Sequence, residues 1–367
     1  MIRVALDAMG ADGGVKPMVQ GAAQASLEPS PSGTGGENDI FGVPSPGGMR
    51  NARENPGPAR GVTVVLVGDE RAIRAALGRH AHDPARIEVV HAGEVVSMRD
   101  KPGAALDDKP DCSILRAARL VAEGGADVLV SAGNTGAVIL ASSRSFSRLE
   151  GVRRVGLCAV HPTVALHGPH GDPFALMLDV GATLQCGAEE LVAFALMGSC
   201  YSRIVSDIAA PRVGLLSNGS EAQKGTPAVV EAHARLGERA GLAFAGNVEG
   251  LDIPRGTVDV VVCEGFVGNI VLKMLEGVSE VARDLAKHAY AAKLRYKIGL
   301  ALLSSGLRRV RELTDWKQYG GAPILGFDHA VIKAHGRSNA RAIRNALKVA
   351  AKTVERELVP EMKKALA

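Results

Sequence analysis

Short apolar runs alternate with longer amphipathic stretches along most of the chain. The run Val128-Leu129-Val130 has no alternating polar position, so both faces of this strand are expected to be buried, as in a parallel sheet. Helical patterns follow most of the apolar runs, and this rhythm predicts an α/β fold with helices on both faces of a mostly parallel sheet. Strands are expected near 2–7, 62–67, 86–91, 126–131, 155–160, 174–180, 212–217, 242–246 and 258–263, and helices near 15–27, 69–79, 112–124, 134–147, 187–206, 226–240 and 267–299.

Two segments differ from the rest of the chain, which is otherwise expected to form a single α/β/α unit over residues 1–367. Residues 29–60 are dominated by Pro, Gly, Ser, Asn and charged residues, which predicts a flexible low-complexity insertion outside the site. Residues 285–311 carry seven basic residues and no acidic one, which is typical of a basic amphipathic helical arm. Such an arm can pack at a dimer interface, lie on anionic lipid or contact an acidic partner.

Composition excludes several classes of protein. The net charge of +4 is too small to indicate a nucleic-acid partner, and the five cysteines are scattered without the spacing of a disulfide framework or a metal site. There is no signature for NAD or ATP and no serine-hydrolase motif, so neither a cofactor nor a metal is expected. No signal peptide and no membrane-spanning run stand out, which predicts a cytoplasmic protein that is at most membrane-associated.

Small, hydrogen-bonding residues follow the predicted strands at several places. Glycines there allow close backbone approach to a ligand, and amide groups at helix N-termini suit an anion. Because a parallel sheet brings the carboxyl ends of its strands to one edge, these residues predict one anion-binding cleft. The residues in such positions are Asp7, Gly10, Ser131, Gly133, Asn134, Thr135, Asp179, Gly219, Lys224, Gly225, Gly268, Asn269 and Lys273.

Several of these residues also fit purely structural roles. Ser131 and Asn134 are good helix caps, and Asp179 either orients a substrate group or only caps the following helix. Near the C-terminus, Lys333 and His335 follow a glycine-rich turn at 319–326. His335 is a candidate general acid or base because its ordinary pKa lies near neutrality, although solitary histidines are often structural.

Nine short motifs resemble, in order over nearly the whole chain, the bacterial acyl-ACP:phosphate acyltransferases of phospholipid synthesis (PlsX-type). Each motif is weak alone, and together they are specific. They are Asp7-Ala-Met-Gly10, Met98-Arg-Asp-Lys-Pro102, Val130-Ser-Ala-Gly-Asn-Thr-Gly-Ala137, Leu178-Asp-Val-Gly-Ala182, Phe194-Ala-Leu-Met-Gly198, Gly246-Asn-Val-Glu-Gly250, Glu264-Gly-Phe-Val-Gly-Asn-Ile270, Tyr319-Gly-Gly-Ala-Pro323 and Ala334-His-Gly336.

The resemblance implies a fold and an activity. The fold would be a three-layer α/β/α unit like that of isocitrate and isopropylmalate dehydrogenases, with a protruding helical arm and a homodimeric assembly. The activity would be transfer of a long-chain fatty acyl group from acyl carrier protein to inorganic phosphate, without a cofactor. The acyl phosphate would then serve a membrane glycerol-3-phosphate acyltransferase, which implies peripheral membrane contact.

The resemblance also implies roles for the strand-end residues. Lys224, Lys273 and the amides around Gly133 to Thr135 would hold phosphate, and Asn134 or Asn269 would donate to the oxyanion. His335 would protonate the departing sulfur, with Lys333 as the alternative donor. The remaining residues expected to bind substrate are Asp7, Gly10, Lys101, Ser131, Asp179, Gly219, Gly225 and Gly268.

The chain departs from the family pattern at Asp107, Thr183, Gln185 and Ser217. Two other functions therefore remain open. One is a short-chain phosphate acyltransferase that uses coenzyme A thioesters. The other is a regulatory paralogue that binds an acyl group or phosphate with little turnover.

Overall fold

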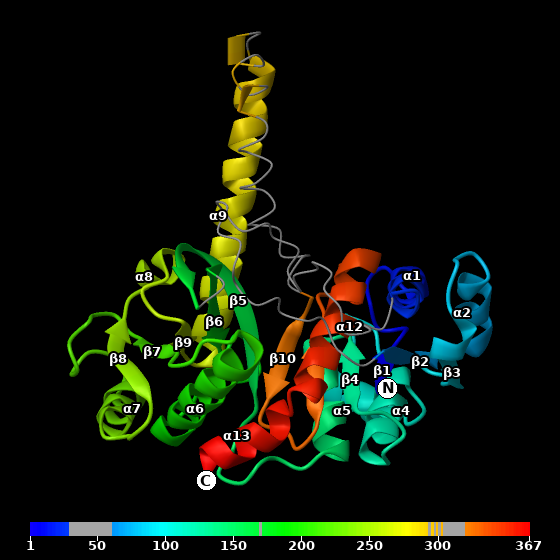
Figure 1. Cartoon of the computed structure of the whole chain (residues 1–367), viewed down its shortest axis with the longest axis horizontal. Coiled ribbons are helices and arrows are strands. Elements are labelled where there is room, and N and C mark those ends of the chain that lie inside the picture. Colours follow the sequence, from blue (N-terminus) through cyan, green and yellow to red (C-terminus); the bar gives the residue numbers. More distant parts are fainter. Residues whose placement is uncertain (29–60, 169–170, 293–294, 297–298, 300–301, 304–319) are drawn as a thin grey trace, which may run out of the picture.

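The computed structural model describes residues 1–28, 61–168, 171–292, 295–296, 299, 302–303 and 320–367. Within these residues the strands form one eleven-stranded sheet in the order β3-β2-β1-β4-β11-β10-β5-β6-β9-β7-β8 (Figure 1). The strands are β1 (Ile2–Asp7), β2 (Val62–Gly68), β3 (Ile87–His91), β4 (Val128–Ser131), β5 (Gly156–His167), β6 (Asp172–Leu178), β7 (Arg212–Leu216), β8 (Ala243–Val248), β9 (Val260–Val262), β10 (Ala322–Leu325) and β11 (Ala330–Lys333).

The sheet is mixed, and its two halves run in opposite directions. Strands β3, β2, β1, β4 and β11 are parallel to one another, and so are β6, β9, β7 and β8. Between them β10 is antiparallel to both β11 and β5, and β5 is antiparallel to β6. Through β10 and β5, however, the register places Leu178, the last residue of β6, in the same row as Ile332, one residue before the end of β11. The two parallel groups therefore run toward each other, and their carboxyl ends meet near the middle of the sheet. The prediction of one cleft at the strand ends stays a prediction.

Helices cover both faces of the sheet and complete three layers. In the first half, Val4 and Leu6 of β1 pack in the apolar cluster of α1, α2 and α12, whereas Ala5 packs in that of α4 and α5. In the second half, α6, α7 and α13 cover one face, and residues of α8 and α9 pack on the other. The helices are α1 (Val15–Ser26), α2 (Glu70–Leu77), α3 (Pro102–Asp108), α4 (Ser113–Ala122), α5 (Thr135–Ser145), α6 (Ala188–Val205), α7 (Pro227–Gly237), α8 (Asp252–Arg255), α9 (Gly265–Ala292), α12 (Ala340–Glu355) and α13 (Leu358–Leu366).

The predicted α/β/α class is confirmed, and each predicted strand and helix is present, with bounds that differ at the ends. The sequence reading missed the short strands β10 and β11, which it treated as a glycine-rich turn, and the C-terminal helices α12 and α13. The predicted insertion 29–60 lies outside the described residues. Of the predicted basic arm 285–311, residues 285–292 continue α9, which projects from the body in Figure 1, and most of the remainder lies outside the described residues.

Helix α9 starts in direct contact with the loop that follows β6. A Cβ atom added at Gly268 would lie 1.9 Å from the carbonyl oxygen of Asp179 and 2.8 Å from Sγ of Cys263. Only glycine allows this approach, so Gly268 fixes the position from which α9 projects. Among the described residues, no helix has the length and apolar character needed to cross a membrane.

Replacing Gly268 by alanine should destabilise the protein by about 1–3 kcal/mol, because the added methyl group has no room against the Asp179 carbonyl. Gly277 provides a matched control in the same helix, since a Cβ there meets no atom within 4 Å. Gly277→Ala should raise the free energy of unfolding by up to about 1 kcal/mol, because alanine loses less backbone entropy. Urea unfolding followed by circular dichroism measures both, and equal effects of the two substitutions would contradict the packing described.

Candidate functional site

Three polar residues form a row at the carboxyl edge of the first half of the sheet. Asp7 of β1 is in register with Ser131 of β4, and Ser131 is in register with Lys333 of β11. All three side chains are buried. Because these strands are parallel neighbours, Asp7, Ser131 and Lys333 end adjacent strands at the same level of the sheet.

The carboxylate of Asp7 is held by two serine hydroxyls. Ser131 Oγ donates to Oδ2 and Ser113 Oγ donates to Oδ1, both over 2.7 Å. Ser131 Oγ in turn accepts a hydrogen bond of 3.0 Å from the backbone N–H of Gly133. Sequence reasoning missed Ser113. The signal was its place in α4, four residues before the buried Ala117, where a serine interrupts an otherwise apolar face.

The loops after β1 and β4 touch through two glycines. A Cβ atom at Gly10 would lie 2.8 Å from the Cα of Gly133 and 3.0 Å from Oδ2 of Asp7. Side chains at either position would separate the loops. The two glycines therefore keep the backbone close to the Asp7 carboxylate, as expected for a loop that encloses a small ligand.

Lys333 is a buried cation with spare hydrogen-bonding capacity. Its side chain is 6% exposed, and its ammonium donates to the carbonyl oxygen of Ala334. An ammonium has three N–H groups, so two of them lack an acceptor in the part of the chain that the structure describes. Burial lowers the pKa of Lys333 to about 8, although the charges of Asp7 and Asp12 act in the opposite direction. A cation in this state favours an anionic ligand.

His335 lies where the two halves of the protein meet. Burial lowers its pKa, and the positive charges of Lys273 and Lys333 lower it further, while Glu276 opposes them. Its Nδ1 accepts a hydrogen bond of 3.1 Å from the backbone N–H of Arg337. At neutral pH the imidazole is therefore uncharged and carries its hydrogen on Nε2. Lys273 itself is exposed on α9 and forms an ion pair with Glu276.

Asn134 fastens a neighbouring loop. Its Oδ1 caps α5 by accepting from the N–H of Ala137, and its Nδ2 donates to the carbonyl oxygens of Met98 and Asp100. This loop leads to Lys101, which is exposed at the start of α3. In this structure the side-chain amide of Asn134 is thus already engaged with the protein, which leaves the backbone N–H groups at the start of α5 as donors for a ligand.

A narrow hollow lies above this arrangement. Its lining combines the polar groups of Asp7, Ser113, Gly133 and Asn134 with apolar side chains from α4 and α5. Thr135 opens α5 at the same place. The hollow lies between the Asp7 carboxylate and the N-terminus of α5.

Asp179 directly follows β6 in the second half of the sheet, where it builds its own loop. Its carboxylate accepts hydrogen bonds from the backbone N–H groups of Leu157, Gly181, Ala182 and Thr183. It also accepts one from the hydroxyl Oγ1 of Thr183. Thr183 Oγ1 also accepts from the N–H of Gly265, so the loop is tied to the start of α9. The departure from the family pattern at Thr183 therefore keeps a side chain that binds both neighbours.

Asn269 belongs to this second group rather than to the row at Lys333. A Cβ atom at Gly181 would lie 3.9 Å from Oδ1 of Asn269, which places the Asn269 side chain beside the Asp179 loop. Another departure, Asp107, forms a surface ion pair of 2.6 Å with Arg144. The contacts of Asp107 and Thr183 are thus structural.

The loop after β7 forms a third group, and β10, β5, β6 and β9 lie between β7 and β11 in the sheet. Lys224 is exposed, and a Cβ atom at Gly219 would lie 2.8 Å from its Cγ. Asn247 of β8 holds the loop by donating to the carbonyl oxygens of Glu221 and Lys224. The structure therefore does not bring Gly219, Lys224 and Gly225 to the row of Asp7, Ser131 and Lys333.

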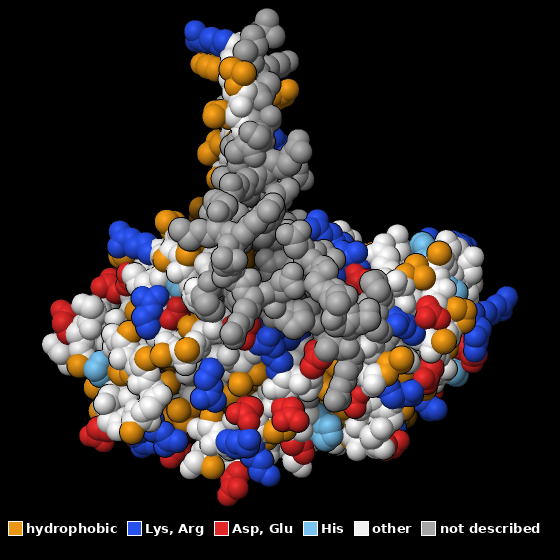
Figure 2. All heavy atoms as spheres, viewed as in Figure 1, with side chains coloured by type: hydrophobic (Ala, Val, Ile, Leu, Met, Phe, Trp, Pro, Cys, Tyr) orange, Lys and Arg blue, Asp and Glu red, His pale blue; other side chains and the backbone are white. Residues whose placement is uncertain are grey.

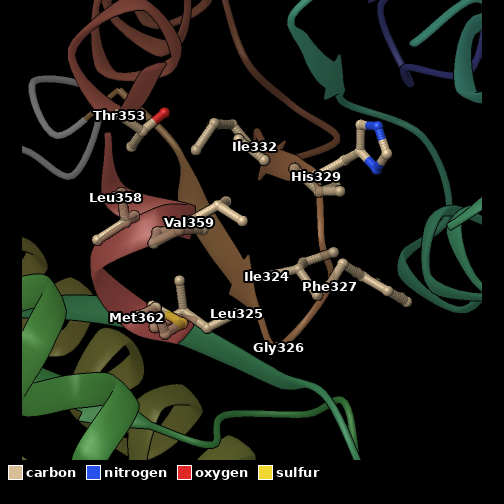
Figure 3. Close-up of a pocket in the computed structure, with 13 residues that line it drawn as sticks. Ile324, Leu325, Gly326, Phe327, His329, Ile332, Thr353, Leu358, Val359 and Met362 are labelled. Atoms are coloured by element: carbon tan, nitrogen blue, oxygen red, sulfur yellow. The ribbon is translucent and has the colours of Figure 1, made fainter. Parts of the chain in front are cut away.

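An apolar hollow between the β10–β11 hairpin and α13 is a different kind of feature. Figure 3 shows Leu358, Val359 and Met362 facing Ile324 and Ile332 across it. The imidazole of His329 points away from α13 and stacks on Phe146 at 4.7 Å. With no charged side chain directed into it, this hollow is a packing gap of the core and not an anion site. In the described residues, no group of three or more His, Cys, Asp or Glu is arranged to hold a metal ion.

The sequence matches a known family. The model of the family described as fatty acid synthesis protein matches residues 48–361. The phosphate acyltransferase of Desulfitobacterium hafniense is 39% identical over 367 residues, which cover 100% of this chain and 98% of the relative. The phosphate acyltransferase of Dictyoglomus turgidum is 36% identical over 357 residues, which cover 97% of this chain and 95% of the relative.

Solved structures share the fold. A phosphotransacetylase from Streptococcus pyogenes superimposes with a TM-score of 0.57 at 15% identity, over 96% of this chain and 94% of the other. A phosphotransacetylase from Staphylococcus aureus does so with a TM-score of 0.56 at 14% identity and the same coverage. At these identities the likeness concerns the arrangement of helices and strands.

Burial of Lys333 should leave a signature in the pH dependence of stability. Between about pH 8 and pH 10.5 the unfolded chain keeps a proton that the folded protein has lost, so the free energy of unfolding should rise with pH. The difference between the two pKa values corresponds to about 3 kcal/mol.

Lys333→Met removes the titrating group with little change of volume. The difference in unfolding free energy between this variant and the wild type should therefore change by up to about 3 kcal/mol between pH 7 and pH 10.5. Urea unfolding of both proteins at a series of pH values measures this difference, and the titration of all other groups contributes equally to both. Parallel curves for the two proteins would exclude a depressed pKa at Lys333.

Proposed function

This chain belongs to the fatty acid synthesis family of phosphate acyltransferases, and we propose that it transfers a long-chain fatty acyl group from acyl carrier protein to inorganic phosphate. The observation that carries the proposal is the buried ammonium of Lys333, which has unused N–H groups and lies in register with Ser131, at the end of the strand whose loop leads into α5. We further propose that the enzyme works in the cytoplasm at the membrane surface, where a glycerol-3-phosphate acyltransferase consumes the acyl phosphate.

The reaction needs positioning and charge stabilisation. An oxygen of hydrogen phosphate attacks the thioester carbonyl, an oxyanion forms, and the carbon–sulfur bond then breaks. The sulfur leaves as a thiolate and takes up one proton, while the new acyl phosphate loses the proton that phosphate carried. The protein must hold a dianion beside a carbonyl and supply one proton to the sulfur, and no cofactor is required.

Lys333 suits the proton donor better than His335. At neutral pH Lys333 carries a proton, and its pKa of about 8 lies close to the ordinary thiol value of about 8.5, so transfer to the leaving sulfur is nearly balanced in free energy. His335 is already uncharged, with its hydrogen on Nε2. We therefore propose Lys333, the alternative donor in the sequence-based hypothesis, as the acid, and the Nε2–H of His335 as a donor to the oxyanion in place of Asn134 or Asn269.

Phosphate would bind between Lys333 and the N-terminus of α5. The backbone N–H groups of Thr135 and Gly136 at the start of α5 supply donors there, since that of Gly133 already donates to Ser131, and Lys273 adds positive charge from α9. Asp7 is not proposed as a phosphate ligand, because both of its oxygens already accept hydrogen bonds and its charge repels an anion. Lys224 is left out of the site because four strands separate β7, which precedes its loop, from β11.

The direct test is formation of acyl phosphate from palmitoyl-ACP, trapped as the hydroxamate, with and without inorganic phosphate. The wild type should give phosphate-dependent product, and Lys333→Met should lower kcat by about 10²–10⁴-fold, as expected for loss of a general acid. Lys364→Met, which removes an exposed lysine on α13, is the control and should keep wild-type turnover.

Acetyl and palmitoyl thioesters of coenzyme A belong in the same assay, because a preference for acetyl-coenzyme A would favour the short-chain alternative. Absence of phosphate-dependent product from every thioester, in a folded protein that binds phosphate, would support the regulatory alternative and overturn the proposal.

The apolar stripe along α9 supports the proposed homodimer. Phe266, Ile270, Met274, Val278, Val281 and Leu285 recur every three or four residues on one side of the helix, and each is more than half exposed. Figure 2 shows the hydrophobic side chains along the projecting arm. A contiguous exposed apolar surface of this kind is typical of an interface.

The charges of α9 favour a second copy of the chain over anionic lipid as the partner of this stripe. Glu276, Glu280 and Asp284 balance Lys273, Arg283 and Lys287, so residues 265–292 have no net charge apart from His288. A helix that lies on anionic lipid usually has an excess of Lys and Arg on its polar face. The basic residues that follow Ala292 lie mostly outside the described residues, and their contact with carrier protein or lipid stays a prediction.

Introducing charge into the stripe should abolish the dimer. Met274→Glu combined with Val281→Glu places two carboxylates in the proposed apolar interface, where burying them is unfavourable. We expect a dimer for the wild type and a monomer for the double variant in sedimentation equilibrium, whereas Glu280→Lys, outside the stripe, should stay dimeric. A monomeric wild type at micromolar concentration would rule out this interface.

A further inference from the structure

Asp7 and Lys333 are buried opposite charges that do not touch. They lie on β1 and β11, with β4 between them, and no carboxylate oxygen of Asp7 comes within the 4.0 Å of an ion pair with the ammonium of Lys333. At low dielectric the attraction between such charges is strong, so some feature of the protein must hold them apart.

The two serine hydroxyls provide that feature. Ser131 lies between the charged residues in the register and binds Oδ2 of Asp7, while Ser113 binds Oδ1 from α4. Among the described residues, the other donor to Oδ1 is the N–H of Met9, at 3.3 Å, which is a long hydrogen bond. Ser113 therefore supplies the short hydrogen bond that anchors this oxygen.

We propose that Ser113 is a positioning residue that keeps Asp7 from pairing with Lys333 and so leaves the ammonium hydrogens free for phosphate. This inference rests on the proposed function for the identity of the anion. Without the Ser113 hydroxyl, Oδ1 of Asp7 would be a buried acceptor with one weak donor, and the nearest compensation is the Lys333 ammonium. An ion pair between them would occupy the hydrogens that phosphate needs.

The charged groups around Lys333 fix the direction of the expected change. Asp7 on β1 and Asp12 in the loop after it attract the ammonium, and burial opposes its charge. A direct contact with Asp7 would raise the pKa of Lys333 from about 8 toward its ordinary value of 10.5. Phosphate binding needs the charged lysine, so the pH above which phosphate affinity is lost would move upward. Below that pH the affinity would fall, because the ammonium would be paired with Asp7.

The test is titration calorimetry with inorganic phosphate between pH 6.5 and pH 10. The wild type should lose phosphate affinity as the pH rises, and the pH midpoint of this loss should lie near the Lys333 pKa of about 8. Ser113→Ala should bind phosphate at least about tenfold more weakly at pH 7, the size expected for losing a hydrogen bond to a charged group, and its midpoint should rise. Ser142→Ala is the control, since Ser142 is a buried serine of α5 whose hydroxyl has no partner among the described residues.

A double-mutant cycle with Asp7→Asn separates positioning from a general packing effect. The neutral amide cannot form the ion pair with Lys333, so Ser113→Ala should not move the midpoint further in this background. The inference would be overturned if Ser113→Ala bound phosphate more weakly but kept the wild-type midpoint. It would also be overturned if Ser113→Ala shifted the midpoint equally in the Asp7→Asn background. Urea unfolding of each variant establishes that the proteins compared are folded.

The outcomes also separate this inference from the proposed function. If no thioester gives acyl phosphate, but phosphate binds and the midpoint shifts in Ser113→Ala, the acyltransferase proposal fails and the positioning role stands. If acyl phosphate forms and the midpoint does not shift, the positioning role fails and the proposed function stands. In the active enzyme, the same upward shift should be seen in the alkaline limb of the kcat profile, because a Lys333 with a higher pKa keeps its proton to higher pH.

Discussion

A carboxylate and an ammonium buried at the ends of neighbouring strands set the requirements for the rest of the site. Burying either charge is costly unless it is compensated by hydrogen bonds or by an opposite charge. Asp7 is compensated by two serine hydroxyls, and the loops around it contain Gly10 and Gly133 because their backbones pass within contact distance of the carboxylate. Lys333 is compensated only in part. This imbalance gives the site its preference for an anion.

The reversal of strand direction at β10, β5 and β6 divides the polar strand ends into two groups, one from each half of the sheet, whose ends meet near its middle. Asp179 and its loop serve mainly to position α9, through Thr183 and the close approach at Gly268. From that start, α9 brings the charge of Lys273 close enough to act on His335. A helix anchored in the second half therefore contributes charge to the candidate site of the first half.

Family membership and geometry support the same chemistry from different directions. Relatives of similar length are phosphate acyltransferases, and the buried lysine beside a helix N-terminus suits an attacking phosphate and a departing thiolate. The contacts of Thr183 with Asp179 and Gly265 explain how a departure from the family pattern keeps the loop intact. The exposed apolar stripe of α9, on a helix whose Lys, Arg, Asp and Glu balance, supports the proposed dimer.

The sequence by itself determined the three-layer class, most strands and helices, and the polar residues that end β1 and β4, because these follow from local periodicity and from the chemistry of short motifs. It did not determine the direction of β6 to β9 or the hairpin β10–β11, whose four-residue strands are too short to show a period. Nor did it reveal Ser113, which meets Asp7 across 106 residues of chain. Strand direction and such hydrogen bonds are decided by pairing between distant segments, so only the tertiary structure could show how the two halves meet and assign Asp7 to a buried network.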